Sequence, residues 1–418
     1  MLTKEENELI CRVGPGTPMG EMIRRFWIPA CLSDELPAPD CDPIRVRLLG
    51  EDLLAFRDSN GRVGVMEEHC PHRGASLFFA RNEEGGIRCL YHGWKMDVDG
   101  NVVDTPCEPA TLRVKTRAFP TYEQGEIVWT YMGPRDKQPE FHNFWWSTIP
   151  MENRCVGKID YACNYVQAIE GALDSSHAAY LHSGYEALHW SEEEIRKIEP
   201  YRTTSKNTKW EVEDTPWGFR YAALRQAPRD PESKAVRITA FAVPFHCLLA
   251  ETPHMFVPAD DEYTWYYDIR TDLENTIDRS VSLAQRGQRV GIDVMPDHRK
   301  VRTLQNNYHQ DRAAMRARDE IWSYSGIPWG KPHQDMCVIE SMGPIYDRTK
   351  EHLGIQDVGV VRMRQRLVDS VRSFMDTGEV AALDPSTGYS QARGTTTVVP
   401  KDVPWQSIGN GNAGQVSG

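Results

Sequence analysis

The stretches His69-Cys-Pro-His-Arg-Gly74 and Cys89-Leu-Tyr-His-Gly-Trp94 decide the fold of this chain. Each contains one Cys and one His, as Cys70-x-His72 and Cys89-x-x-His92, and sixteen residues separate the two pairs. Two such pairs can hold a two-iron two-sulfur cluster, with both Cys on one iron and both His on the other. The imidazoles raise the reduction potential well above that of an all-Cys cluster, so such a centre readily accepts an electron.

A structural zinc site is the alternative interpretation, because zinc also takes mixed Cys and His ligands. Zinc sites usually keep Cys with Cys, whereas here each half supplies one of each. Pro71 and Gly74 flank the first pair, and Gly93 and Trp94 follow the second. These neighbours supply tight turns and a cover against water, so the pattern favours the iron-sulfur cluster.

The two stretches resemble the Rieske domain of the non-haem iron ring-hydroxylating oxygenases. Three further segments are similar to the group around phthalate dioxygenase: Gly14-Pro-Gly-Thr-Pro-Met-Gly20, Arg24-Arg-Phe-Trp-Ile-Pro29 and Glu351-His-Leu-Gly354. The resemblance covers residues 1 to about 405. It implies an oxygenase component with a Rieske [2Fe-2S] cluster and a mononuclear non-haem Fe(II). It also implies NAD(P)H-derived electrons delivered by a separate flavin and iron-sulfur reductase, and a homotrimer or a dimer of trimers.

A second candidate site can be read independently of this resemblance, on a helix predicted over about residues 161 to 180. Polar residues there recur at helical spacings of three and four, where side chains share one face: Asn164, Gln167, Glu170, Asp174 and His177. His182 follows His177 by five, so the helix must end or distort between them. Two His and one carboxylate form the facial triad of iron(II) oxygenases. The alternative is that His177 and His182 are core histidines whose hydrogen bonds are satisfied within the protein.

The third ligand need not be local in sequence. In the resembling family it is an Asp on a later helix, and the matching residue is Asp335 in His333-Gln-Asp-Met-Cys-Val-Ile-Glu340. Asp311 and Asp347 also lie in polar helical segments, and only the family position favours Asp335.

The resemblance assigns roles to three residues of the polar stripe. Asp174 is expected to bridge the two centres by bonding His177 and, in a neighbouring subunit, His92. Asn164 is expected to line the open side of the iron and to orient dioxygen, and Glu170 to support the bridge. The alternative for Asp174 is that it only caps the helix or satisfies a buried neighbour.

The substrate implied by the family is aromatic, and it is either dihydroxylated to a cis-diol or oxidised at a methoxy group with loss of formaldehyde. The run Val236-Arg-Ile-Thr-Ala-Phe241 alternates, so Arg237, Thr239 and Phe241 share one strand face. Arg202 stands just before the first predicted strand. Because Arg recognises carboxylates bidentately, we expect an anionic aromatic substrate bound by Arg237 and Arg202. A surface salt bridge is the alternative for either Arg.

Composition agrees with a redox enzyme of two domains. At 418 residues the chain exceeds one hydrophobic core. It lacks the roughly 18 uninterrupted apolar residues of a membrane span and the apolar region of a signal peptide, so we expect a cytoplasmic protein. Ten Cys without a short spaced framework then indicate thiols and ligands rather than disulfides. The net charge of −12 argues against nucleic acid as a partner.

The pattern along the chain predicts an α+β protein with an N-terminal Rieske β domain. We expect residues 1–140 to form this domain with a short N-terminal helix, and 141–378 to form a catalytic domain with an antiparallel sheet covered by helices. Residues 379–418 are expected to lie along the surface or to be partly disordered. In the catalytic domain the predicted strands cover 207–226, 235–250 and 263–270, and the later helices lie near 276–287, 305–322, 333–341 and 361–376.

A Rieske electron carrier with an appended binding domain is a different class of protein. Iron stoichiometry separates the two, since a carrier holds two irons per chain and an oxygenase three. A carrier has no use for the polar stripe from Asn164 to His182, so the sequence favours the oxygenase.

Overall fold

The computed structural model describes the whole chain except residues 1, 184–206, 228–229, 250–251, 318–323 and 409–418. It divides into two compact units. The small unit comprises Arg12–Asn143 and Val257–Asp261, and the large unit comprises Met1–Cys11, Phe144–Phe256 and Glu262–Gly418. The N-terminal helix, which the sequence placed in the Rieske domain, therefore belongs to the large unit.

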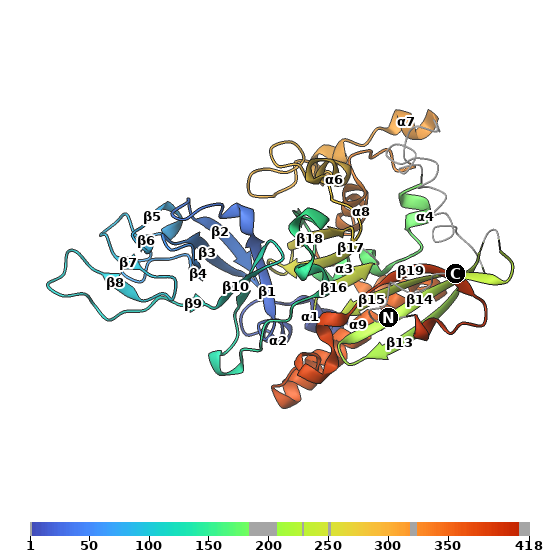
Figure 1. Cartoon of the computed structure of the whole chain (residues 1–418), viewed down its shortest axis with the longest axis horizontal. Helices are drawn as coiled ribbons and strands as arrows, with labels where there is room; N and C mark the ends of the chain where they lie inside the picture. Colours follow the sequence, from blue (N-terminus) through green and yellow to red (C-terminus); the bar gives the residue numbers. More distant parts are fainter. Residues whose placement is uncertain (1, 184–206, 228–229, 250–251, 318–323, 409–418) are drawn as a thin grey trace. The chain divides into compact units, whose positions relative to one another are not determined.

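The small unit is built from three antiparallel sheets of short strands (Figure 1). Their orders are β1-β11-β10, β2-β3-β4-β9 and β5-β6-β7-β8. Gly61 and Gly100 adopt positive φ angles in the tight turns that join β3 to β4 and β7 to β8. The elements are α2 (Pro18–Ile23), β1 (Trp27–Leu32), β2 (Ile44–Leu48), β3 (Glu51–Arg57), β4 (Val63–Glu67), β5 (Arg81–Glu83), β6 (Gly86–Arg88), β7 (Lys95–Met96), β8 (Val102–Asp104), β9 (Ala118–Phe119), β10 (Thr121–Gln124) and β11 (Ile127–Tyr131).

An eight-stranded antiparallel sheet forms the centre of the large unit. Its order is β12-β18-β17-β16-β15-β14-β13, and β19 also pairs with β15. The register aligns Tyr221 with Thr239 and Thr239 with Leu249, so alternate residues of neighbouring strands share one face. The strands are β12 (Arg154–Tyr161), β13 (Lys209–Thr215), β14 (Gly218–Gln226), β15 (Ser233–Ala242), β16 (His246–Leu249), β17 (Thr252–Pro258), β18 (Thr264–Thr271) and β19 (Thr395–Pro400).

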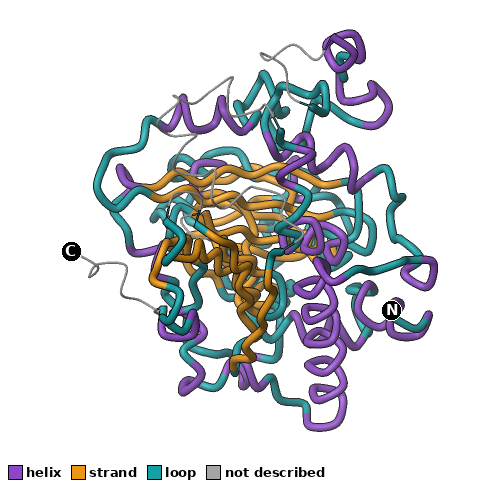
Figure 2. Tube along the Cα trace, turned by 90° about the vertical axis from the view of Figure 1, so that its right-hand side faces the viewer, coloured by secondary structure: helices purple, strands orange, loops and turns teal. Residues whose placement is uncertain are grey.

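Helices complete the large unit, which confirms the α+β class (Figure 2). The longest, α9, ends where Gly378 takes the left-handed conformation of a C-cap. The helices are α1 (Lys4–Cys11), α3 (Tyr165–Leu173), α4 (Ala178–Leu181), α6 (Arg279–Arg286), α7 (Arg312–Ala317), α8 (Lys331–Glu340) and α9 (Val358–Thr377). In the described part of the chain, none of the helices has the length and apolarity needed to cross a bilayer.

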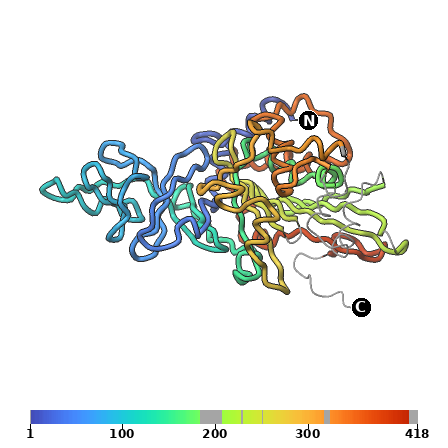
Figure 3. The backbone as a smooth tube through the Cα atoms, turned by 90° about the horizontal axis from the view of Figure 1, so that it is seen from above, coloured from blue at the N-terminus to red at the C-terminus, as the bar shows by residue number. Residues whose placement is uncertain are grey.

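The C-terminal segment includes an ordered strand that the expectation of a surface-lying or partly disordered tail did not specify, and residues 409–418 of that tail lie outside the described residues. Thr395–Pro400 forms β19, which pairs with β15 from Ser233 to Ile238 and runs beside it (Figure 3). Trp405 is buried with Val236 and Val399, and its indole nitrogen donates to Glu211 at 2.6 Å. Because the partners of Trp405 and β19 lie far away in the sequence, no local pattern in the segment indicated this burial.

Other elements differ from the prediction in extent. The predicted strand over 207–226 is the hairpin of β13 and β14. The predicted helix over 305–322 begins as a 3-10 turn at Leu304–His309, continues as α7 and then leaves the described residues. The strands β12 and β17 were not predicted.

Candidate metal centres

Two loops of the small unit bring the Cys-x-His and Cys-x-x-His pairs together with the same backbone pattern. The Cys70 nitrogen donates to Ala75 and the Cys70 carbonyl accepts from Gly74, at 2.8 and 2.9 Å. Cys89 repeats this with Trp94 and Gly93, at 2.8 and 3.0 Å. Gly74 and Gly93 both need a positive φ of about 73° to 74°, which only glycine adopts readily.

The histidines of the two loops lie side by side. The rings of His72 and His92 are 4.6 Å apart between centroids. Trp94 stacks on His72 at 4.5 Å with a 7° interplanar angle, as expected for a cover against water. Nδ1 of His92 is buried and has no hydrogen-bond partner in the described chain. A buried nitrogen of this kind is what a metal ligand requires.

The thiols complete the donor set. Cys70 and Cys89 are both buried and unbridged. Burial raises the pKa of Cys70, and the neighbouring Cys89 raises it further. Two adjacent buried thiols and two adjacent imidazoles on paired loops fit the mixed ligation of a Rieske cluster.

The second site begins where α3 ends. The sequence predicted a helix to about residue 180, but α3 stops at Leu173 and Asp174 is its C-cap. The Asp174 carboxylate accepts from the backbone nitrogens of Ser176 and His177, at 2.7 and 3.3 Å. These bonds form a turn that separates α3 from the short α4, which His177 and His182 flank. The break therefore comes before His177 rather than after it.

Three donor atoms converge beyond this turn. Nε2 of His177 lies 3.3 Å from Nε2 of His182, and each nitrogen lies 3.3 to 3.4 Å from Oδ1 of Asp335 on α8. No other group of three or more potential ligands is as close together in the described residues. Two nitrogens and one carboxylate oxygen converging in this way fit the facial triad of non-haem iron.

Neighbouring groups orient the two imidazoles. Nδ1 of His182 pairs with Gln334 Oε1 at 2.7 Å, so Nε2 is left for the convergent site. Nδ1 of His177 is 3.8 Å from Asp174 and has no hydrogen-bond partner in the described chain. Burial opposes ionisation of Asp335, but the two imidazoles outweigh it and lower the pKa of this carboxyl. Burial lowers the pKa of His177, and the two carboxylates more than reverse that effect.

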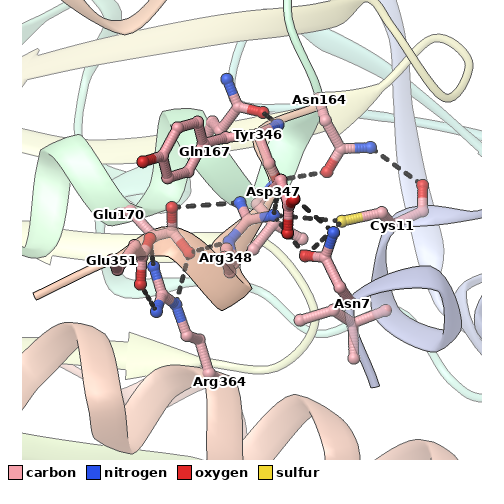
Figure 4. Close-up of polar contacts among 12 residues, drawn as sticks. Asn7, Cys11, Asn164, Gln167, Glu170, Tyr346, Asp347, Arg348, Glu351 and Arg364 are labelled. Atoms are coloured by element: carbon pink, nitrogen blue, oxygen red, sulfur yellow. Dashed lines mark hydrogen bonds and ion pairs between the residues drawn. The ribbon is translucent and has the colours of Figure 1, made fainter. Parts of the chain in front are cut away.

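The N-terminal part of the polar stripe does not join this group (Figure 4). Asn164 caps α3 by accepting from Val166 at 3.1 Å, and its amide nitrogen donates to the Cys11 carbonyl at 2.9 Å. These bonds occupy the side chain and leave its predicted role in orienting dioxygen without support. Glu170 accepts from Arg348 and Arg364 instead of contacting Asp174 through its side chain. Helical spacing identified the shared face but not what covers it.

Arg237 lies on β15, on the face predicted with Thr239 and Phe241. It is partly buried, whereas Thr239 and Phe241 are fully buried. The Arg237 side chain makes no hydrogen bond or ion pair to any described residue. Its charge acts on His177, and the pKa of Arg225 is lowered to about 10 by burial and by Arg237. Arg202 lies outside the described residues.

Sequence reasoning missed two residues at this site. Gln334 orients His182, and only its position beside Asp335 could have drawn attention to it. Tyr221 on β14 bonds Ser175 at 2.7 Å and donates to the Leu173 carbonyl, so it fixes the turn after α3 from the sheet side. No local pattern marks Tyr221, because its partners lie 46 and 48 residues away.

Comparisons with known proteins match both parts of the chain. A Rieske [2Fe-2S] domain model matches residues 26–123, and a model described as LigXa C-terminal domain like matches residues 130–415. The chain is 41% identical to the phthalate 4,5-dioxygenase oxygenase subunit of Pseudomonas putida, over 97% of this chain and 94% of that protein. It is 33% identical to the 3-chlorobenzoate-3,4-dioxygenase oxygenase subunit of Comamonas testosteroni, over 97% of each. The structure of dicamba monooxygenase bound to dicamba shares the fold, with a TM-score of 0.56, 16% identity and coverage of 85% of this chain and 98% of that one.

The fold and the matches define an oxygenase with a Rieske domain. The chain belongs to the Rieske non-haem iron aromatic-ring-hydroxylating oxygenases, as an oxygenase subunit whose C-terminal domain is LigXa-like. Enzymes of this family use a Rieske [2Fe-2S] cluster and a mononuclear non-haem iron.

Proposed function

We propose that this subunit hydroxylates an aromatic carboxylate of the phthalate type by cis-dihydroxylation. The overall reaction adds both atoms of dioxygen to adjacent ring carbons and consumes two electrons and two protons. The observation that carries the proposal is the convergent His177, His182 and Asp335 group, with Arg237 on the same sheet face as Tyr221, which bonds the turn before His177. The names of both relatives support it, since they are dioxygenases of phthalate and of 3-chlorobenzoate, which are anionic aromatic acids.

The proposed ligands follow from the two donor sets. Cys70, His72, Cys89 and His92 would hold the cluster, and the other three residues would hold iron(II). When bound, these groups supply one electron at a time and the open coordination positions at which dioxygen is activated. Gln334 and Asp174 would fix the two imidazole rings, as carboxylate and amide partners commonly do for metal-bound histidines.

Asp174 would also carry the connection to the cluster of a neighbouring subunit in a homotrimer. Its Oδ1 is used by the turn, which leaves Oδ2 beside His177 Nδ1 at 3.8 Å. A separate flavin and iron-sulfur reductase would feed the cluster, in the cytoplasm. Sedimentation of the purified protein tests the trimer, and cluster reduction by NADH with and without such a reductase tests the partner.

Arg237 would pair with the substrate carboxylate. It offers a two-pronged guanidinium on the sheet face that also carries Tyr221 and Thr239. Because no described residue neutralises it, a bound carboxylate would be its partner. Arg202 is included as a second proposed contact of the carboxylate on the basis of the sequence alone.

The test compares kcat/KM for the best benzoate or phthalate and for its methyl ester. Arg237→Ala should cost the acid roughly 2 to 5 kcal/mol, which is about 30-fold to several thousandfold. Arg237→Lys should recover part of the loss, because the charge returns without the fork. The ester should hardly change. Equal losses on both substrates, or none, would make Arg237 structural.

A matched control and product analysis complete this test. Arg362→Ala removes a half-buried Arg that pairs with Asp214 in the same unit, and it should leave kcat/KM for both substrates unaffected. Formation of formaldehyde from a methoxybenzoate, with no diol from any acid, would replace dihydroxylation by O-demethylation.

A further inference from the structure

A segment that follows the Asp335 helix runs along α3 and bonds it at successive turns. We call residues Glu340–Glu351 the connecting segment. Glu340 accepts from the Ala162 nitrogen, and the Pro344 carbonyl accepts from the Asn164 nitrogen, both at 2.8 Å. The Gln167 side chain donates to Gly343 and accepts from Tyr346, at 3.0 and 2.6 Å. The connecting segment therefore covers the polar stripe of α3 at Gln167.

Arg348 is the centre of the last of these contacts (Figure 4). Its side chain is 0% exposed and forms two bonds with Glu170, at 2.7 and 3.0 Å. A third bond, at 2.8 Å, reaches Asn7 of α1, and the Cys11 sulfur lies 3.4 Å away. Burial raises the pKa of Cys11 to about 11, so the thiol stays neutral beside the guanidinium.

Two further charges balance the group. Arg364 of α9 bonds Glu170 at 2.6 Å and Glu351 at 2.5 and 2.8 Å. The group therefore contains two cations and two carboxylates, and it joins α1, α3, α9 and the connecting segment. Removal of Glu170 leaves the Arg348 guanidinium without its carboxylate, and removal of Arg348 leaves Glu170 and Glu351 to share the single cation Arg364. Either change unbalances buried charge, which is far more costly than the loss of an exposed pair.

The position of this group relates it to the metal site. The Asp174 nitrogen donates to the Glu170 carbonyl at 3.0 Å, so Glu170 lies one turn before the Asp174–His177 turn. At the other end, the connecting segment begins at Glu340, five residues after Asp335 on the same helix. Arg348 and Glu170 therefore tie the segment that carries His177 to the segment that carries Asp335.

We propose that Arg348, paired with Glu170, is a positioning residue for the mononuclear metal site. It holds α3 in register with the connecting segment, and so sets the distance between the histidines and Asp335. This role goes beyond the proposed function and rests on its ligand set. Groups behind the metal ligands typically contribute 10- to 100-fold in metal affinity.

The experiment measures the Fe(II) dissociation constant of the full-length protein by competition with a chelator. Arg348→Met should bind Fe(II) about 10- to 100-fold more weakly and keep the visible absorbance of the Rieske cluster. Arg348→Lys should restore part of the affinity, because an ammonium neutralises Glu170 but cannot also reach Asn7. The EPR signal of the ferrous nitrosyl complex should broaden or shift in Arg348→Met, which a loss of stability alone would not cause.

Controls separate positioning from general stability. Lys350→Met removes an exposed pair two residues away, where the side chains of Lys350 and Asp347 are 73% and 48% exposed, and should leave Fe(II) affinity unchanged. If Arg348→Met does not fold, Asn7→Ala removes one neutral acceptor of Arg348 and should still weaken Fe(II) measurably. Wild-type affinity and an unchanged EPR signal in the folded Arg348 or Asn7 variants, or an equal loss in Lys350→Met, would overturn the proposal.

Measuring the Fe(II) affinity of His177→Ala in the same series tests the proposed ligand set separately from the positioning role of Arg348. Loss of Fe(II) in His177→Ala together with the expected Arg348 effect supports both. Loss in His177→Ala without an Arg348 effect overturns only the positioning role. Retention of Fe(II) by His177→Ala overturns the ligand set and the positioning role with it.

Discussion

The two metal centres of this oxygenase are built over very different lengths of sequence. The proposed cluster ligands lie between Cys70 and His92, on two loops with the same hydrogen-bond pattern and the same positive-φ glycine. The proposed iron ligands come from a turn after α3 and from α8, and His182 is 152 residues from its partner Gln334. A centre of the first kind is set by local turns, whereas one of the second kind depends on how distant elements pack.

This difference predicts that the two centres can be lost separately. His177→Ala or His182→Ala should abolish oxygenation, because each removes one of three iron ligands. The red-brown absorbance of the cluster should persist, since no ligand is shared. Cys70→Ala should instead bleach the cluster. Visible spectra and iron content per chain check this, and a cluster bleached as fully by His177→Ala as by Cys70→Ala would contradict the assignment of the second site.

The connection between the centres should be sensitive to one charge. Asp174→Asn keeps an oxygen that can accept from Ser176 and His177, so the turn should survive and all three irons should remain. The negative charge beside His177 Nδ1 is lost. We expect electron transfer from the reduced cluster to slow by about 10- to 100-fold. Stopped-flow absorbance on mixing with substrate and dioxygen measures it, and reoxidation at the wild-type rate would remove Asp174 from the path.

The same contrast explains what the sequence could and could not predict. The cluster loops and the His177–His182 pair are local, so spacing alone indicated both. Asp335 required family resemblance, since two other Asp residues matched the pattern. The partners of Asn164 and Glu170 could not be predicted, because a helical face can be read from spacing, whereas Arg348 and Arg364, which cover it at Glu170, lie 178 and 194 residues away. β19 was missed for the same reason.

The N-terminal helix offers a test of long-range dependence. Tyr165 donates to the Ile10 carbonyl at 2.9 Å, and Asn164 donates to Cys11, so α1 supports the start of α3. Removal of residues 1–11 should weaken Fe(II) binding by about tenfold and leave the cluster absorbance unchanged. Arg372→Met is the control, because it breaks only an exposed pair between α9 and Glu6 of α1. Equal Fe(II) affinity in the truncated and intact proteins would show that the iron site does not depend on α1.

The smallest expected effect is the contribution of Glu170 to the loss of folding stability at low pH. Burial favours the protonated form of Glu170, but Arg348 and Arg364 outweigh it and lower the pKa of this carboxyl. A carboxyl with a lowered folded pKa contributes stability that is present above its unfolded pKa of about 4.3 and is lost as pH falls through the folded value. Between pH 7 and 5.5, Glu170 should therefore add no pH dependence to the free energy of unfolding.

Below about pH 4.5, the wild type should lose stability faster than Glu170→Gln, by at most ~1.4 kcal/mol per pH unit. Glutamine does not titrate, so in Glu170→Gln this side chain takes up no proton on unfolding and adds nothing to the slope. The variant is less stable than the wild type at every pH. Urea unfolding followed by far-UV circular dichroism at several pH values gives both slopes, and only the difference between them is compared. Glu83→Gln is the control. It removes a carboxyl that pairs with Arg81 in the small unit, so the pH dependence of the free energy of unfolding of the large unit should not change. Parallel slopes for wild type and Glu170→Gln would mean that Glu170 keeps an ordinary pKa and that the two arginines do not hold it as a charged partner. The iron centre would then depend less on buried charges far apart in the sequence, and its contrast with the locally built cluster centre would be weaker.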